Sequence, residues 1–164
     1  MSEAVDPAIL KSLAFLAGAT DNEVRQLLPA ARVEEYPQDA SLFQEGDVLG
    51  HVFIVVTGTV ALEISGRDRR PRRLQTIGPG ELLGWSPLLG PGSMTAAARA
   101  LTAVRVVALD ARAILDVCGQ DPRFGYNFMR RTAATIAGRL SATRLQMLDV
   151  YGAEVPVADE GGGP

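Results

Sequence analysis

The chain has 164 residues, a formal net charge of −3 and 47% hydrophobic residues, which is typical of one globular domain with a sizeable core. No apolar run approaches the ~20 residues of a membrane span, and the N-terminus lacks the order of a signal peptide. The acidic balance argues against an extended nucleic-acid-binding face. We therefore expect a soluble cytoplasmic protein without membrane association.

The supply of catalytic and metal-binding side chains is small. One cysteine, Cys118, can form no internal disulfide, and one histidine, His51, provides no cluster for a zinc site. We interpret His51 as a structural or surface residue and Cys118 as a small apolar filler. The sequence therefore predicts no enzyme activity, no metal site and no resident cofactor.

Residues 1–31 are predicted to form an N-terminal helical segment. Asp6-Pro7 places an acid at a helix cap and a proline in the first turn. Thr20 and Glu23 have the spacing of a capping box, which opens a second short helix. Both helices are expected to lead into a sheet rather than form a separate domain.

Residues 32–109 alternate between short apolar segments and turn residues, a pattern typical of a β-sandwich or β-roll. The fold class is therefore α+β and mainly β. Periodicity alone leaves the topology open. The predicted strands cover residues 33–36, 41–44, 52–56, 59–64, 74–77, 94–101 and 104–109.

Between two of these strands, residues 66–73 (GRDRRPRR) carry five arginines and a proline. Two interpretations remain open: a solvated hairpin tip, or a patch that binds an acidic partner. No aromatic residue alternates with the arginines and the whole chain is acidic, which favours the solvated tip. If the tip does bind a partner, a protein is favoured over DNA.

Residues 110–152 are predicted to be helical. Asp110 caps a short helix over 111–117, and Asp121-Pro122 opens a long one. The long helix carries a 4-3-4-3 apolar spacing typical of a coiled-coil seam, made of Met129, Ala133, Ile136, Leu140, Thr143, Met147 and Val150. We expect a homodimer along this seam; the alternative is that the seam is core within one chain.

A second face of the long helix, formed by Phe124, Phe128 and Leu145, is expected to pack on the β-roll. After the helix, residues 153–164 show no periodicity and are predicted to be a disordered tail.

Residues 78–99, GPGELLGWSPLLGPGSMTAAAR, interrupt the β pattern. Glycine lets backbone N–H groups approach a ligand closely, and the start of a short helix favours anions. We interpret this stretch as a phosphate-cradling loop. In it Glu81, expected to be buried, accepts a hydrogen bond from a ligand hydroxyl.

This stretch resembles the phosphate-binding cassette of cyclic-nucleotide-binding domains in the catabolite activator protein and FNR superfamily. Residues 37–62 resemble the first half of that family's β-roll, and residues 129–146 (MRRTAATIAGRLSATRLQ) resemble its long dimer helix. The resemblance covers roughly residues 9–152. It implies a double-stranded β-helix jelly-roll with cyclic AMP or cyclic GMP as possible ligand.

The resemblance also implies a set of ligand-binding residues. The family's glutamate, which bonds the ribose, corresponds to Glu81, and Thr95 takes the place of its phosphate-binding hydroxyl. Thr143 matches a base-contacting threonine, although a hydrogen bond to its own helix would explain it equally well. The full implied set is Gly80, Glu81, Leu82, Leu83, Thr95 and Thr143.

The sequence departs from the family's pattern at the phosphate. Met94 stands where an arginine is expected, and Arg144 replaces a serine that contacts the base. Arg99 is the nearest substitute, but in a regular strand it faces away from Met94. Loss of a bidentate guanidinium would weaken ligand binding by roughly two or more orders of magnitude. Trp85 could stack on a base, but we interpret it as core.

Two functions follow from the resemblance. The first is a stand-alone regulatory or sensor module that signals to an unidentified protein partner through its long helix. It would bind no DNA directly, since the family's helix-turn-helix domain would begin where this chain stops. The alternative is a degenerate domain without ligand, acting as a dimeric adaptor or complex subunit, as Met94 and Arg144 suggest.

Overall fold

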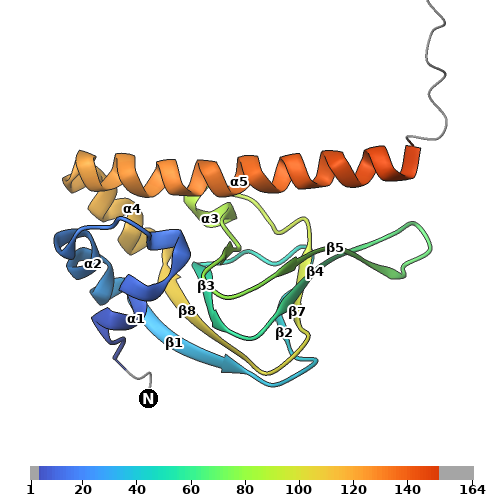
Figure 1. Ribbon diagram of the computed structural model, residues 1–164, viewed down its shortest axis with the longest axis horizontal. Coiled ribbons are helices and arrows are strands. Elements are labelled where there is room, and N and C mark those ends of the chain that lie inside the picture. Colours follow the sequence, from blue (N-terminus) through green and yellow to red (C-terminus); the bar gives the residue numbers. More distant parts are fainter. Residues whose placement is uncertain (1–3, 152–164) are drawn as a thin grey trace, which may run out of the picture. The chain divides into compact units, whose positions relative to one another are not determined.

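The computed structural model describes residues 4–151 (Figure 1). The helical elements are α1 (Pro7–Ser12), η1 (Ala14–Leu16), α2 (Asp21–Leu27), η2 (Leu28–Ala30), α3 (Ser86–Leu89), α4 (Ala111–Gln120) and α5 (Pro122–Tyr151). The strands are β1 (Ala31–Tyr36), β2 (Ser41–Phe43), β3 (His51–Thr57), β4 (Val60–Ser65), β5 (Pro71–Ile77), β6 (Leu82–Leu83), β7 (Ala97–Ala100) and β8 (Val104–Asp110). The chain divides into two compact units, Met1–Thr132 and Ala133–Pro164. The predicted tail at 153–164 lies outside the described residues.

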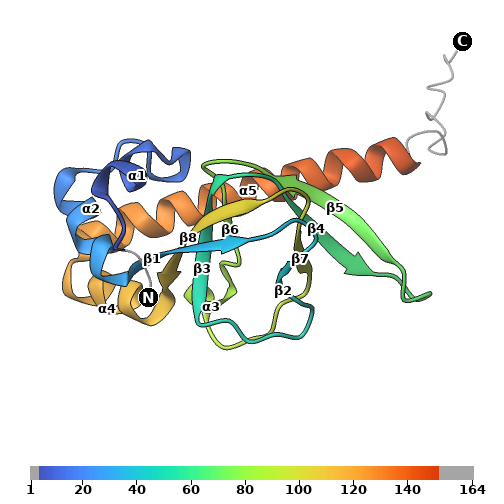
Figure 2. The same ribbon diagram turned by 90° about the horizontal axis from the view of Figure 1, so that it is seen from below.

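The eight strands form two four-stranded antiparallel sheets. Their orders are β1-β8-β3-β6 and β2-β7-β4-β5, so each sheet combines strands far apart in sequence (Figure 2). This arrangement confirms the predicted jelly-roll, with helices before and after the strands. Within residues 4–151, no helix has both the length and the apolar character needed to cross a bilayer.

Two hydrophobic cores explain why the central strands are apolar on both faces. Along β8, Val107 and Leu109 belong to a helix-side core shared with the helices. Val106 and Ala108, which alternate with them, belong to an inner core between the two sheets. Successive side chains of a strand point to opposite faces, so a strand with both faces covered reads as a continuous apolar run.

Several element bounds differ from the predicted ones. Strand β5 begins at Pro71 rather than at residue 74, because Pro71, Arg72 and Arg73 are all exposed and show no apolar alternation that would mark a strand. Helix α4 extends to Gln120. Strand β7 covers only Ala97–Ala100, so Met94 lies before it. The two-residue β6 was not predicted, since two residues are too few to show a period.

The first turns of α5 are held to the rest of their unit by three aromatic rings. Phe128, 1% exposed, stacks on Phe124 with 5.8 Å between ring centroids and meets Phe15 edge-on at 5.6 Å. These contacts confirm that Phe124 and Phe128 form a packed face. Leu145, the third residue of the predicted face, is exposed and lies in the second unit.

A polar row runs along β1 and reaches the single histidine. Nη1 of Arg32 lies 2.6 Å from Nε2 of His51, and Nε of Arg32 donates to Oε1 of Glu34 at 2.6 Å. Tyr36 donates its hydroxyl to Glu34 Oε2 at 2.5 Å. Burial, together with this bond to Glu34, raises the pKa of Tyr36. His51 is therefore part of a structural network.

A buried carboxylate joins α2 to α5. Glu23, whose side chain is 7% exposed, completes the predicted capping box by accepting from the Thr20 amide at 2.8 Å. Its other oxygen, Oε1, accepts from Asn127 Nδ2 at 2.8 Å, and Arg131 Nη2 lies 3.6 Å from Oε2. Burial opposes ionisation of Glu23, but these donors outweigh it and lower its pKa.

The Glu23 carboxylate is therefore expected to stabilise the fold above the ordinary pKa near 4.5 and to lose that effect as the pH falls below it. Glu23→Gln removes the charge and leaves one acceptor oxygen in place of two, so it should lower the free energy of unfolding by at least about 1 kcal/mol at pH 7. It should also flatten the loss of stability between about pH 5 and pH 3. Urea unfolding across this range measures both effects.

Glu35→Gln is the control, because the Glu35 side chain is 78% exposed. It should leave the stability at pH 7 and the pH profile unchanged. Equal profiles for the wild-type protein and Glu23→Gln would contradict the assigned role of Glu23.

Candidate functional site

The predicted phosphate-cradling loop begins as a packed turn. Gly80 is buried with φ +83°, and its amide donates to the Val55 carbonyl at 2.7 Å. Its own carbonyl accepts from the Phe15 amide at 2.9 Å, and a Cβ at this position would lie 2.9 Å from the backbone nitrogen of Ala14. Glycine is thus required here for close packing on η1, and its amide is already bonded within the protein.

Glu81 was expected to be buried, and the structure shows it exposed. Its Oε2 accepts from the Gly78 amide at 2.6 Å, while its own amide donates to the Gly78 carbonyl at 3.2 Å. The carboxylate therefore closes its own turn. A carboxylate offers about four lone-pair sites, so the ribose contact stays a prediction for the remaining ones.

Gly80→Ala tests the packing of this turn. A left-handed backbone costs a non-glycine residue about 1 kcal/mol, and the contact with Ala14 adds to that cost. We expect the free energy of unfolding to fall by about 2 kcal/mol.

Gly18→Ala is the matched control for Gly80→Ala, because Gly18 has φ +77° and no atom within 4 Å of the added Cβ. It should cost only the backbone term of about 1 kcal/mol. Urea denaturation of both variants measures the difference, and equal losses would show that the turn does not need the close approach to Ala14.

Leu82 and Leu83 form β6 and are fully buried. They pair with Ile54 and Phe53 of β3, and their side chains enter the helix-side core and the inner core respectively. Both side chains are therefore part of the scaffold, which leaves only backbone groups of β6 for a ligand.

Helix α3 starts later than the glycine turn. Gly84 has φ +73°, Trp85 is the N-cap residue, and the helix begins at Ser86. Trp85 packs against the helix-side core, as interpreted from the sequence. Either Gly80 or Gly84 can be aligned with the glycine that precedes the family's glutamate. If Gly84 is chosen, which lies just before the helix, Trp85 and not Glu81 occupies the position of that glutamate. The sequence prediction missed this second alignment.

Met94 is fixed beside the inner core. Its amide donates to the Asp47 carbonyl and its carbonyl accepts from the Gly46 amide, both at 2.8 Å. The side chain is half-buried against the inner core, whereas the neighbouring Thr95 is exposed. An apolar group thus occupies the position where the resemblance implies a phosphate-binding cation.

Arg99 is already paired with carboxylates on its own sheet. Its Nη2 and Nε bond to Glu63 at 2.6 Å and 3.3 Å, and Nη1 lies 3.3 Å from Asp39. The hydrogen bonds to Glu63, with the charges of Glu63 and Asp39, raise the pKa of Arg99. This guanidinium cannot meet a ligand phosphate without leaving those partners.

Thr143 belongs to the second unit and is described within it alone. Its hydroxyl donates to the Arg139 carbonyl one turn back at 3.0 Å, so the hydrogen bond to its own helix is present. The base contact remains a prediction. The structure brings Gly80, Glu81, Leu82 and Leu83 together, while Thr95 follows in the segment between β6 and β7.

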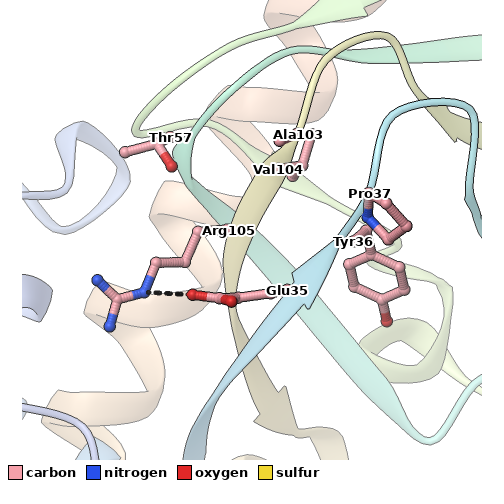
Figure 3. A pocket seen from close by; sticks show the side chains of 7 residues that line it. All are labelled: Glu35, Tyr36, Pro37, Thr57, Ala103, Val104 and Arg105. Carbon is pink, nitrogen blue, oxygen red and sulfur yellow. Dashed lines mark ion pairs between the residues drawn. The ribbon is translucent and has the colours of Figure 1, made fainter.

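A recess of about 450 Å³ lies apart from all these residues (Figure 3). Arg105 and Glu35 point toward one another beside it, with 3.8 Å between Nε and Oε1. Their charges offset each other, which leaves no net charge to attract an anion. The lining residues are Glu35, Tyr36, Pro37, Thr57, Ala103, Val104 and Arg105.

Comparison with known proteins identifies relatives of the whole roll. The family model of the cyclic nucleotide-binding domain matches residues 33–121, more than half of the chain. The CRP-like cAMP-activated global transcriptional regulator of Mycobacterium tuberculosis is 24% identical over 148 residues, which cover 90% of this chain and 64% of that protein. The Cyclic AMP receptor protein of Thermus thermophilus is 29% identical over 138 residues, or 84% and 62% of the two chains. The chain thus spans less than two thirds of the length of these relatives.

Solved structures agree with the fold. The catabolite activator protein of Thermus thermophilus superposes with a TM-score of 0.68 at 30% identity, covering 84% of this chain and 62% of that one. A putative cyclic nucleotide-binding protein from Geobacter metallireducens GS-15 gives a TM-score of 0.73 at 24% identity, covering 83% and 98%. At that identity the second likeness shows the fold alone.

Proposed function

The chain belongs to the cyclic nucleotide-binding domain family, and on that premise we propose that it is a regulatory module that binds a cyclic nucleotide weakly and signals to a protein partner. We assign it a binding role rather than a catalytic one. The observation that carries the proposal is a pair of exposed polar residues on either side of β6: Glu81 directly before it, and Thr95 in the segment that leads to β7. A ribose hydroxyl and a phosphate would meet these two polar groups.

Weak affinity follows from the missing cation. Charge-assisted hydrogen bonds contribute about 1.5–3 kcal/mol each, and within the described residues neither position 94 nor position 99 offers the phosphate a guanidinium without a partner. Met94 is apolar and Arg99 is paired with Glu63. The phosphate would be held by hydroxyl and backbone donors alone.

Signalling would proceed through α5. Three residues of the predicted seam, Leu140, Met147 and Val150, are between 49% and 73% exposed in the second unit. Exposed apolar residues at heptad spacing favour a two-helix seam between copies of the chain. We propose that ligand binding shifts the population of seam arrangements, as far as its affinities for them differ.

A second candidate is a dimeric adaptor that binds no ligand. It is favoured by the amides of Gly80 and Glu81, both of which are bonded within the protein, and by the packing of Met94 on the inner core. In this case the roll serves only to present α5 to its partner.

Titration with cyclic AMP and cyclic GMP separates the two candidates. We expect binding in the high micromolar to millimolar range and, at ten times Kd, stabilisation by roughly 1.4 kcal/mol in thermal shift experiments. The control ligand is 5′-AMP, which has the same base, ribose and phosphate but lacks the cyclic phosphodiester. An absence of heat in calorimetry and of any shift at 10 mM ligand would support the adaptor instead.

A further inference from the structure

The hairpin between β4 and β5 ends in a concentrated positive charge, here called the arginine tip (residues 67–73). It holds five of the chain's 16 basic residues and one of its 19 acidic ones, so the tip carries +4 while the rest of the chain carries −7. All seven residues are exposed. Figures 1 and 2 show this hairpin extending beyond the other strands.

Hydrogen bonds within the turn hold the arginine tip in one shape. The Gly66 amide donates to the Arg70 carbonyl at 3.1 Å, and the Arg69 amide donates to the Gly66 carbonyl at 2.9 Å. Asp68 accepts from the Arg70 amide at 3.2 Å and pairs with Arg72 at 3.3 Å. A preformed turn reduces the ordering cost that a partner would have to offset.

Asp68 neutralises only one of the five arginines. Among the described residues, the other four arginines have no side-chain hydrogen bond or ion pair to a carboxylate: Arg67, Arg69, Arg70 and Arg73. Guanidinium groups bind carboxylates and phosphates through paired N–H donors. Within the described residues, the tip therefore presents four cations without a carboxylate partner.

From these observations we propose that the arginine tip docks an acidic segment of a partner protein. A short acidic peptide can contact the arginine tip, with its charge of +4, without touching the rest of the chain, which carries −7. A long nucleic acid would also approach this negatively charged remainder and be repelled by it. Residues 60–77 contain no aromatic side chain on which a base could stack. The inference requires no ligand in the cassette and so stands apart from the proposed function.

The test uses the full chain and a fluorescein-labelled twelve-residue peptide with eight glutamates, followed by fluorescence anisotropy. A matched peptide with glutamine in place of glutamate is the probe control. We expect binding of the acidic peptide at 50 mM salt and a loss of roughly tenfold in affinity at 300 mM, because exposed charges are screened. No saturable binding at 50 mM salt and millimolar protein would overturn the proposal.

The triple variant Arg67→Gln, Arg70→Gln, Arg73→Gln should bind the acidic peptide about tenfold more weakly. The charge-matched control replaces Arg25, Arg112 and Arg130, all exposed and outside the hairpin, by glutamine. It should stay within about twofold of wild type. Equal losses of peptide affinity in the two triple variants would overturn the proposal, because they would show that binding depends only on the net charge of the protein. Tighter binding of a single-stranded DNA twelve-mer would overturn it in favour of nucleic acid.

Discussion

Phe128→Ala is expected to lower the free energy of unfolding by about 3–5 kcal/mol. The ring is 1% exposed and contacts two other rings, Phe15 from η1 and Phe124 from α5. Its removal takes away apolar burial and leaves a cavity that packed neighbours cannot close. Urea denaturation followed by far-UV circular dichroism measures the loss.

Tyr126→Ala is the matched control for Phe128→Ala, because Tyr126 lies on the same helix and is 64% exposed. It should change stability by no more than about 0.5 kcal/mol. Comparable losses in both variants would mean that the Phe128 contacts do not hold the first turns of α5 to the roll.

Met94→Arg is expected to raise the affinity for cyclic AMP by at least about a hundredfold. The substitution supplies the guanidinium that the resemblance implies for the phosphate, and two charge-assisted hydrogen bonds of about 1.5–3 kcal/mol each allow a gain of this size. The site is suitable because the Met94 backbone is fixed by Gly46 and Asp47 and its side chain is only half-buried. Isothermal titration calorimetry measures the gain.

Two further variants control for charge and for packing at this position. Met94→Lys provides a point charge without the planar fork and should gain about tenfold, and Met94→Gln should gain nothing. If the arginine variant folds normally and binds no better than the glutamine variant, the remaining cassette cannot hold a cyclic nucleotide. The adaptor function would then be favoured.

Local signals predicted most of the scaffold. The capping box of Thr20 and Glu23 forms as expected, and the cap residues Asp6 and Asp110 accept from the amides of Ala8 and Ala113. Caps depend on residues three or fewer positions apart, so the sequence contains all that determines them. The apolar runs of β3 and β8 likewise mark strands covered on both faces.

The candidate site was harder to predict because its polar side chains form hydrogen bonds either with residues far away in the sequence or within their own turn. Arg99 pairs with Glu63, 36 residues away, and no local pattern indicates that bond. Glu81 is exposed because its carboxylate closes a turn with Gly78. The glycines at 80 and 84 allow two alignments of the cassette; the alignment with Glu81 after the glycine was the one predicted, and the alignment with Trp85 there becomes apparent only from the start of α3.

The contact between Arg32 and His51 determines where the proton of the neutral imidazole must be. Arginine has no acceptor and stays protonated, so the Nε2 lone pair receives its N–H and the ring carries its hydrogen on Nδ1. Any copper or zinc ion approaching Nε2 would first have to displace a guanidinium that is also bonded to Glu34. His51, the single histidine of the sequence, is thus unsuited to bind a metal ion through Nε2, although it is only partly buried.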